Sequence, residues 1–171
     1  MPDNLQIRMW QSADVARLHD INEAAVPGVG TLGREPFEDL VANTSDVTFV
    51  ALLDGRIEGF VMGLIEGRDY ASLNYQWLSE RYKDFAYVDR IAVAASARGL
   101  RIGAALYSAM VSHYEGRRDI LLAEVNLAPP NPGSLRFHQR HGFVRVGERW
   151  DDKGGKGVVY LARNLAVRSI P

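Results

Sequence analysis

The feature that most constrains the fold is a strand that leads through a short loop into a helix, between Phe85 and Met110. The segment FAYVDRIAV is dominated by apolar residues, and the turn that follows it, AASARG, consists mostly of small ones. From Ile102 onward, apolar residues recur at helical spacing. A helix that begins directly after a loop containing Gly99 presents unpaired N–H groups together with the positive end of its dipole. This junction therefore predicts an anion site, most often one for phosphate.

Strand and helix patterns alternate along the rest of the chain, which predicts one mixed α/β domain over residues 1–171. The predicted strands are Leu5–Met9, Thr48–Leu53, Arg56–Ile65, Tyr87–Val93, Ile120–Val125, Phe143–Glu148 and Val158–Ala162. The predicted helices are Ser12–Ala25, Pro36–Ala42, Ile102–Glu115 and Asn131–Arg140, with a further short one at Gln76–Tyr82. Because strand–helix–strand units are right-handed, Tyr87–Val93 and Ile120–Val125 should lie parallel to each other.

Several local patterns predict details of the sheet. Asp54-Gly55 is typical of a two-residue hairpin turn, and Gly59 and Gly63 indicate a bulge or a close approach by another backbone. Simple alternation places Val88, Ala92 and Ala94 on one face of their strand, and on the other face Tyr87, Asp89, Ile91 and Val93. The proline-rich segment Asn126–Gly133 is predicted not to continue a strand, and Asp151–Gly157 is predicted to be a polar hairpin tip.

Composition argues against several classes of function. With 47% apolar and 24% charged residues, the chain is average for a soluble globular protein. A net charge of −1 and the absence of long Lys or Arg runs leave no electrostatic footprint for nucleic acid. Cysteine is absent, which removes disulfides, thiolate metal sites and a cysteine nucleophile, and agrees with a cytoplasmic location. No signal segment or membrane-spanning apolar run is visible, so we expect neither secretion nor a membrane partner.

The order of the predicted elements resembles that of the GNAT superfamily of acyl-CoA-dependent N-acyltransferases, most sharply over Phe85–Gly147. The resemblance implies a mixed, mostly antiparallel sheet with one splayed parallel strand pair, flanked by about four helices. In that family a loop of the form Gln/Arg-x-x-Gly-x-Gly/Ala binds the diphosphate of acetyl-CoA through backbone amides. The matching residues here are Arg98, Gly99, Leu100, Arg101, Ile102 and Gly103, with Ala104 next in the helix. Arg101 replaces the inner glycine, which is tolerated if its φ stays negative; its side chain either contacts the cofactor phosphates or points to solvent.

The resemblance also implies how the rest of the cofactor is held. In the family the pantetheine arm lies between the two splayed strands and pairs with one of them, here at Ile91, Ala92 and Val93. Asn126 and Asn131 stand where the family often places side chains that contact this arm, although Asn131 is also a predicted helix N-cap. His138 occupies the position at which many members carry the tyrosine that protonates the leaving thiolate. It is either that acid, with Ser134 one helical turn away as a partner, or a partly exposed histidine without a role.

Aminolysis of a thioester needs a donor for the oxyanion and a base for the amine. The backbone N–H of Val93 is the predicted oxyanion donor. Tyr87 and Asp89 are the first candidates for the base and Glu66 the next, although Asp89 could equally be a structural charge beside its neighbour Arg90. No metal is expected, because no ligand spacing links the other histidines, His19, His113 and His141.

These features predict transfer of an acetyl group from acetyl-CoA to a primary amine of a small molecule or a protein, by direct attack in a ternary complex. A non-catalytic acyl-CoA-binding module is the alternative, motivated by His138 and Arg101, and a homodimer stays open. A Rossmann-type nucleotide site is disfavoured, since G-x-G-x-x-G is absent.

The loop VPGVGTLGREP either shapes a substrate mouth or precedes a helix that covers the sheet. A group of aromatic residues either covers the sheet edge or lines the acceptor pocket: Tyr70, Tyr75, Trp77 and Tyr82.

Overall fold

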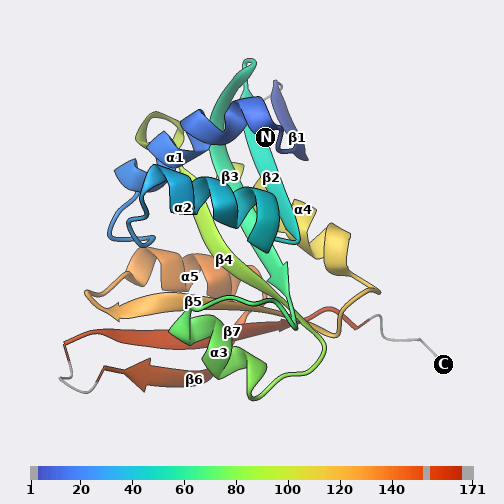
Figure 1. Ribbon diagram of the computed structural model, residues 1–171, viewed down its shortest axis with the longest axis vertical. Helices are drawn as coiled ribbons and strands as arrows, with labels where there is room; N and C mark the ends of the chain where they lie inside the picture. Colours follow the sequence, from blue (N-terminus) through green and yellow to red (C-terminus); the bar gives the residue numbers. More distant parts are fainter. Residues whose placement is uncertain (1–3, 152–154, 167–171) are drawn as a thin grey trace.

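The computed structural model describes residues 4–151 and 155–166, and its strands form one sheet in the order β1-β2-β3-β4-β5-β7-β6 (Figure 1). The strands are β1 (Leu5–Met9), β2 (Val47–Leu53), β3 (Arg56–Ile65), β4 (Phe85–Val93), β5 (Ile120–Ala128), β6 (Val144–Trp150) and β7 (Gly157–Asn164). The α-helices of the described residues are α1 (Val15–Ala24), α2 (Arg34–Asp39), α3 (Leu73–Ser79), α4 (Ile102–Tyr114) and α5 (Pro132–Arg140). Of the neighbouring strands, only β4 and β5 run parallel, which confirms the predicted mixed sheet.

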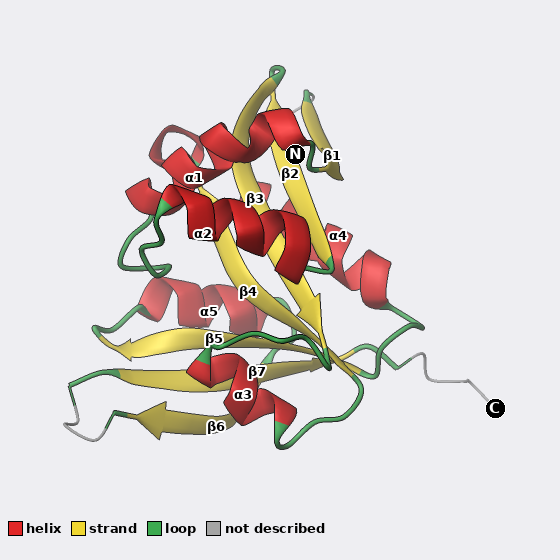
Figure 2. Ribbon diagram, in the orientation of Figure 1, coloured by secondary structure: helices red, strands yellow, loops and turns green. Residues whose placement is uncertain are grey.

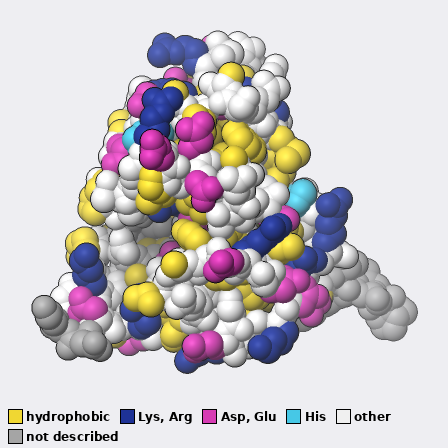
Figure 3. All heavy atoms as spheres, viewed as in Figure 1, with side chains coloured by type: hydrophobic (Ala, Val, Ile, Leu, Met, Phe, Trp, Pro, Cys, Tyr) yellow, Lys and Arg dark blue, Asp and Glu magenta, His cyan; other side chains and the backbone are white. Residues whose placement is uncertain are grey.

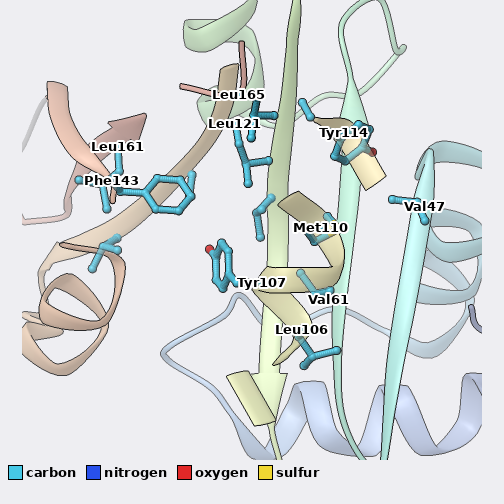
Figure 4. Close-up of a cluster of buried hydrophobic side chains, with 14 of the residues drawn as sticks. Val47, Val61, Leu106, Tyr107, Met110, Tyr114, Leu121, Phe143, Leu161 and Leu165 are labelled. Atoms are coloured by element: carbon cyan, nitrogen blue, oxygen red, sulfur yellow. The ribbon is translucent and has the colours of Figure 1, made fainter. Parts of the chain in front are cut away.

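Helices cover both faces of the sheet (Figure 2). On one face, α1 and α2 pack over β2, β3 and β4, and their apolar side chains meet Phe60 and Met62 of β3. On the other face, α4 packs against β1 to β4, and α5 shares the same core cluster. Figure 4 shows Leu106, Tyr107 and Met110 of α4 in this cluster. The apolar stripe that starts at Ile102 therefore holds α4 firmly against the sheet, and with it the loop that precedes the helix.

Two glycines of β3 let α4 approach closely. A Cβ on Gly59 would lie 3.0 Å from the carbonyl oxygen of Ala92 and 3.1 Å from Cγ2 of Ile102. A Cβ on Gly63 would lie 2.4 Å from Cε of Met110, nearer than real Cβ atoms come to other atoms. The predicted bulges are confirmed, because the pairing shifts register beside Gly59 and beside Gly63. A close approach by another backbone is present only at Gly59, since the atoms nearest to Gly63 belong to side chains of α4.

The parallel pair β4–β5 separates after a short contact. Only Phe85–Val88 of β4 pairs with Ile120–Ala123 of β5, although each strand is nine residues long. A bulge follows at once: Val88 lies opposite Gly63 of β3 and Arg90 opposite Met62, so Asp89 is the extra residue. The bulge bends β4 away from β5, and the splay that the family resemblance implies is present.

The bulge also overturns one prediction about β4. Simple alternation puts Val88 and Ala92 on one face and Ile91 and Val93 on the other. In the structure Val88, Ile91 and Val93 all pack in the core under α4, whereas Ala92 packs under α1 and α2. An extra residue in a strand exchanges the two faces for every residue after it, so the period of two fails at Asp89.

Other local predictions are confirmed or corrected. The turn residues Asp54 and Gly55 have φ of 51° and 76°, as a primed hairpin turn requires. The helix predicted at Gln76–Tyr82 begins three residues earlier, at Leu73, because Ser72 accepts a hydrogen bond from the Tyr75 N–H and so acts as its N-cap. The prediction that Asn126–Gly133 leaves the sheet is wrong at its start, since β5 pairs with β7 through a bulge as far as Ala128. Part of the predicted hairpin tip, residues 152–154, lies outside the described residues.

Candidate active site

A cavity of about 720 Å³ opens where β4 and β5 diverge. Its walls come from the second half of β4, from β5, from the start of α5, from the loop of residues 25–31, from residues 70–74 and from the ends of β6 and β7. Acidic and basic side chains are interspersed over the face that Figure 3 shows, without one large patch of either sign. The cavity is therefore the most prominent functional feature of the described residues.

Most of the predicted binding residues lie in the wall of this cavity. They are Ile91, Ala92, Val93, Arg98, Asn126, Asn131, Ser134 and His138, joined by the predicted base Asp89. Other predicted residues do not line it. They are Tyr87, which is buried beneath it, and the rest of the anion loop, namely Gly99, Leu100, Arg101, Ile102, Gly103 and Ala104. The loop follows Arg98 directly, so it stands at the end of the cavity rather than in its wall.

The anion loop keeps its backbone donors but adopts a conformation that contradicts one prediction. Arg101 is the N-cap of α4 and has φ of 62°, in the left-handed region, where a negative φ is predicted. A side chain is strained there, whereas glycine is not. The first intrahelical bond is donated by Ala105 to the Arg101 carbonyl, at 3.1 Å. The N–H groups of the three preceding residues, Ile102–Ala104, are therefore the orphan donors of the helix start.

The free edge of β4 faces the cavity. The Ala94 N–H donates to the Glu58 carbonyl of β3 at 2.8 Å, so the backbone polar groups of Ala94 point toward β3. Alternate residues of a strand direct these groups to opposite sides. Val93 and Ile91 therefore present their N–H and C=O groups to the gap, where β5 no longer pairs with them. This edge can bind an extended chain that carries amides.

His138 is buried and both of its ring nitrogens are engaged. Its Nδ1 lies 2.8 Å from the Ser134 carbonyl oxygen, which can only accept, so Nδ1 carries the proton. Its Nε2, 2.6 Å from Oη of Tyr107, then accepts from that hydroxyl. Burial lowers the pKa of His138, so the ring is neutral near pH 7. The interpretation as a partly exposed histidine is wrong, because only 3% of the residue is exposed.

Of the three carboxyl groups that line the cavity, Asp89 is a predicted base, whereas Glu124 and Asp151 are not. Asp89 accepts from the Tyr70 hydroxyl at 3.1 Å and pairs with Arg90 at 3.3 Å. Burial raises the pKa of Asp89, and Arg90 partly offsets this. Asp89 thus also fits the interpretation of a structural charge, since Arg90 in turn donates to the Gly30 carbonyl at 2.6 Å and holds the loop of residues 25–31 over the cavity.

Glu124 of β5 is the carboxyl group that sequence reasoning missed. Its Oε1 accepts from the Tyr87 hydroxyl at 2.9 Å and from Nδ2 of Asn74 at 3.2 Å. Its Oε2 is buried and has no hydrogen-bond partner among the described residues. Burial, reinforced by the charge of Asp89, raises the pKa of Glu124 to about 8. The signal in the sequence is a single acidic residue inside the apolar run ILLAEV.

The other predicted residues and segments differ in whether they line the cavity. Glu66 pairs with Arg118 at 2.9 Å and does not line the cavity. Of the four predicted aromatics, only Tyr70 lines it, while Tyr75 packs against Phe85 and Tyr87 of β4 and Trp77 stacks on Tyr160 of β7. The loop of residues 25–31 does line the cavity, which favours its interpretation as a substrate mouth. Within the described part of the chain, no three His, Asp or Glu side chains come together as a metal site, and no helix is long and apolar enough to cross a bilayer.

The splayed parallel pair, with a helix N-terminus at one end of the gap and carboxyl groups along it, defines an acyltransferase class of site. The family model described as "Acetyltransferase (GNAT) family" matches residues 15–143. The chain belongs to the GNAT family and is an acetyltransferase.

Solved structures support the fold over nearly the whole chain. The ribosomal-protein-S18-alanine N-acetyltransferase from Escherichia coli is 16% identical, with a TM-score of 0.74, and the match covers 98% of this chain and 99% of that one. Ard1 from Thermoplasma volcanium is 18% identical, with a TM-score of 0.76 and coverage of 96% and 99%. Arabidopsis thaliana NAA60, solved with a bisubstrate analogue, is 18% identical, with a TM-score of 0.72 and coverage of 94% and 97%. No curated protein sequence matches the chain significantly.

Proposed function

We propose that the protein transfers an acetyl group from acetyl-CoA to a primary amine, by direct attack within a ternary complex. One observation carries the proposal: β4 and β5 stop pairing after four residues each, and a cavity lies between them. The backbone amides on one side of the gap suit the cofactor that carries the thioester. The carboxyl groups near the centre of the gap suit an amine that enters from the other end.

The cofactor is held mainly by the backbone. The orphan N–H groups of Ile102–Ala104 suit its diphosphate, because they combine donors with the positive end of the α4 dipole. The peptide N–H and C=O of Ile91 and the C=O of Val93 suit the amides of the pantetheine arm. Bound acetyl-CoA supplies the activated acetyl thioester, and the protein then needs only to position the amine and move two protons.

Glu124 is the base in this proposal. An amine arrives as an ammonium ion, and Glu124, with its pKa of about 8, accepts the proton near the pH at which the amine must be neutral. Tyr87 and Asn74 orient the carboxylate through Oε1 and leave Oε2 without a partner inside the protein. Tyr87, a predicted base, thus acts as a positioning residue for Glu124 rather than as the base itself.

In this proposal the Tyr107–His138 pair supplies the hydrogen-bond donor for the leaving sulfur. His138 remains at the predicted position, but its neutral ring accepts rather than donates at Nε2. The Tyr107 hydroxyl is therefore the group that turns to the sulfur and donates a hydrogen bond or its proton. The Val93 N–H stabilises the oxyanion that forms when the amine attacks the carbonyl carbon.

The test is release of free thiol from acetyl-CoA with a panel of amines, together with calorimetric titration of CoA. We expect CoA to bind and at least one amine to gain an acetyl group by mass spectrometry. Absence of CoA binding contradicts the proposal. Glu66→Gln is the matched control for Glu124→Gln, because Glu66 lies outside the cavity wall, and only the Glu124 variant should lose turnover.

A further inference from the structure

A second charged side chain stands in the cavity wall beside Glu124. Arg149 of β6 lines the cavity and is separated from Glu124 by a single side-chain amide, that of Asn74. We propose that the acetyl acceptor is a free amino acid, whose amine lies at Glu124 and whose carboxylate is bound by Arg149. This inference rests on the proposed function, because it names the acceptor of the same reaction.

The guanidinium of Arg149 is held in place by neutral groups. Its Nε donates to the Tyr160 hydroxyl and its Nη2 to Oδ1 of Asn74, each at 3.1 Å. Within the described ranges it forms no ion pair, unlike Arg90, which pairs with Asp89. A guanidinium has five N–H donors and only two of them are used here. The others form the planar fork that binds a carboxylate through two parallel hydrogen bonds.

The side-chain amide of Asn74 shows which ligand fits beside it. Its Nδ2 donates to Glu124, and its Oδ1 accepts from Arg149. An α-amino acid offers the same pair at a similar separation, with the ammonium as donor and the carboxylate as acceptor. A ligand lying along Asn74 can therefore contact the carboxyl group of Glu124 and the guanidinium of Arg149 at the same time.

The other charges near this end do not duplicate the role of Arg149. Asp151 and Lys156, at the turn between β6 and β7, also line the cavity, and their charges oppose each other. Asp89, and Glu124 once it has lost its proton, add negative charge at the amine end, where an ammonium is favoured. A simple amine without a carboxylate would leave the guanidinium of Arg149 without a charged partner, which a polar site rejects strongly.

The experiment compares matched acceptors in the thiol-release assay with acetyl-CoA. Each free L-amino acid is measured against its primary amide and its decarboxylated amine. For the best acceptor we expect kcat/KM of the acid to exceed that of the amide at least tenfold. The amine of the amide is less basic, so a larger fraction of it is neutral and able to attack near pH 7. A higher kcat/KM for the acid than for the amide therefore reports recognition of the carboxylate.

Substitutions of two arginines of β6 then distinguish a loss of carboxylate recognition from a loss of folding. Arg149→Met should lower the acid-to-amide ratio of kcat/KM at least tenfold, mainly through KM, and Arg149→Lys should give an intermediate ratio. Arg145→Met is the matched control, because Arg145 lies on the same strand and pairs with Glu148 away from the cavity. This control should keep the ratio of the wild type. Thermal melting and CoA titration check that each variant is folded.

Each outcome is decisive for one of the two proposals. If the wild type acetylates amides as well as acids, or acetylates peptide N-termini but no free amino acid, the acceptor assignment is overturned while acetyl transfer stands. An unchanged ratio in folded Arg149→Met overturns it as well. If CoA does not bind, the proposed function fails first, and the acceptor assignment fails with it.

Discussion

Glu124→Gln should remove activity and at the same time stabilise the protein at alkaline pH. Glutamine keeps the shape of the side chain and an oxygen for the hydrogen bonds from Tyr87 and Asn74. It removes the carboxylate, which is the group that we propose accepts the proton of the amine. Removal of a general base typically lowers a rate by about 10² to 10⁴. We therefore expect kcat to fall by this factor.

The stability change follows from the raised pKa of Glu124. The pKa is about 8 in the folded protein and near its ordinary value of 4.5 after unfolding. Between these two values the folded state binds the proton and the unfolded state does not, so wild-type stability falls as pH rises. Each pKa unit corresponds to about 1.4 kcal/mol, which gives a loss of roughly 4 kcal/mol from this group between about pH 5 and 8.5. Glutamine does not titrate, so the Glu124→Gln variant does not lose this stability as the pH rises.

Urea denaturation of both proteins at pH 5 and pH 8.5 measures the effect as a difference, which cancels the titration of other groups. The stability of Glu124→Gln relative to the wild type should rise between these values, and wild-type kcat/KM should increase with pH up to about 8. Glu66→Gln should keep the kcat of the wild type. A relative stability that is independent of pH refutes the burial argument, and a kcat within a few-fold of the wild type refutes the role as base.

Three further substitutions test the packing around the site. Arg101→Gly should stabilise the protein by about 1 kcal/mol in urea denaturation, because glycine adopts φ of 62° without strain. Tyr107→Phe leaves Nε2 of His138 buried without its donor and should cost about 1–3 kcal/mol, seen as a lower melting temperature. Gly63→Ala puts a methyl group 2.9 Å from Oη of Tyr114, which a hydrogen bond to Asp46 holds in place, and should cost about 1–3 kcal/mol in the same measurement.

Two of these substitutions have a counterpart that should behave differently. Arg98→Gly, at a residue with φ of −66°, should not stabilise, so a gain there equal to that of Arg101→Gly contradicts the strain argument. Gly133→Ala places its Cβ 4.0 Å from the nearest atom and should change stability little. If Tyr107→Phe melts like the wild type, the hydroxyl does not support His138 in the way the short distance indicates.

Local chemistry explains why much of the fold could be predicted from the sequence. The turn at Asp54-Gly55, the end of α4 at Gly116 and the start of α5 at Asn131 depend on neighbouring residues only, and the structure has all three. The irregular pairing at Gly59 and Gly63 could also be predicted, because glycine inside a strand often marks a bulge, whereas the packing of α4 on these glycines could not. The splay of β4 and β5 came from the family resemblance.

The parts that sequence reasoning missed depend on contacts between distant segments. Glu124, Asn74 and Arg149 come from three separate elements, and nothing in the spacing of these residues shows that they meet. The sequence analysis did not single out Tyr107, and only the packing of α5 against α4 reveals its hydrogen bond to His138. The bulge at Asp89 exchanges the faces of β4, and the glycine that lies at it, Gly63, is on the neighbouring strand β3, so the sequence of β4 itself does not mark it.

The open edge of β4 bears on how such a chain can change over evolutionary time. A cofactor arm recognised by peptide groups places little demand on the identity of the side chains around it, so the sequence can drift while the architecture persists. Solved structures that share 16–18% of residues with this chain have the same fold. The substitution that such an edge tolerates least is proline at Ile91 or Val93, since proline alone lacks the amide hydrogen.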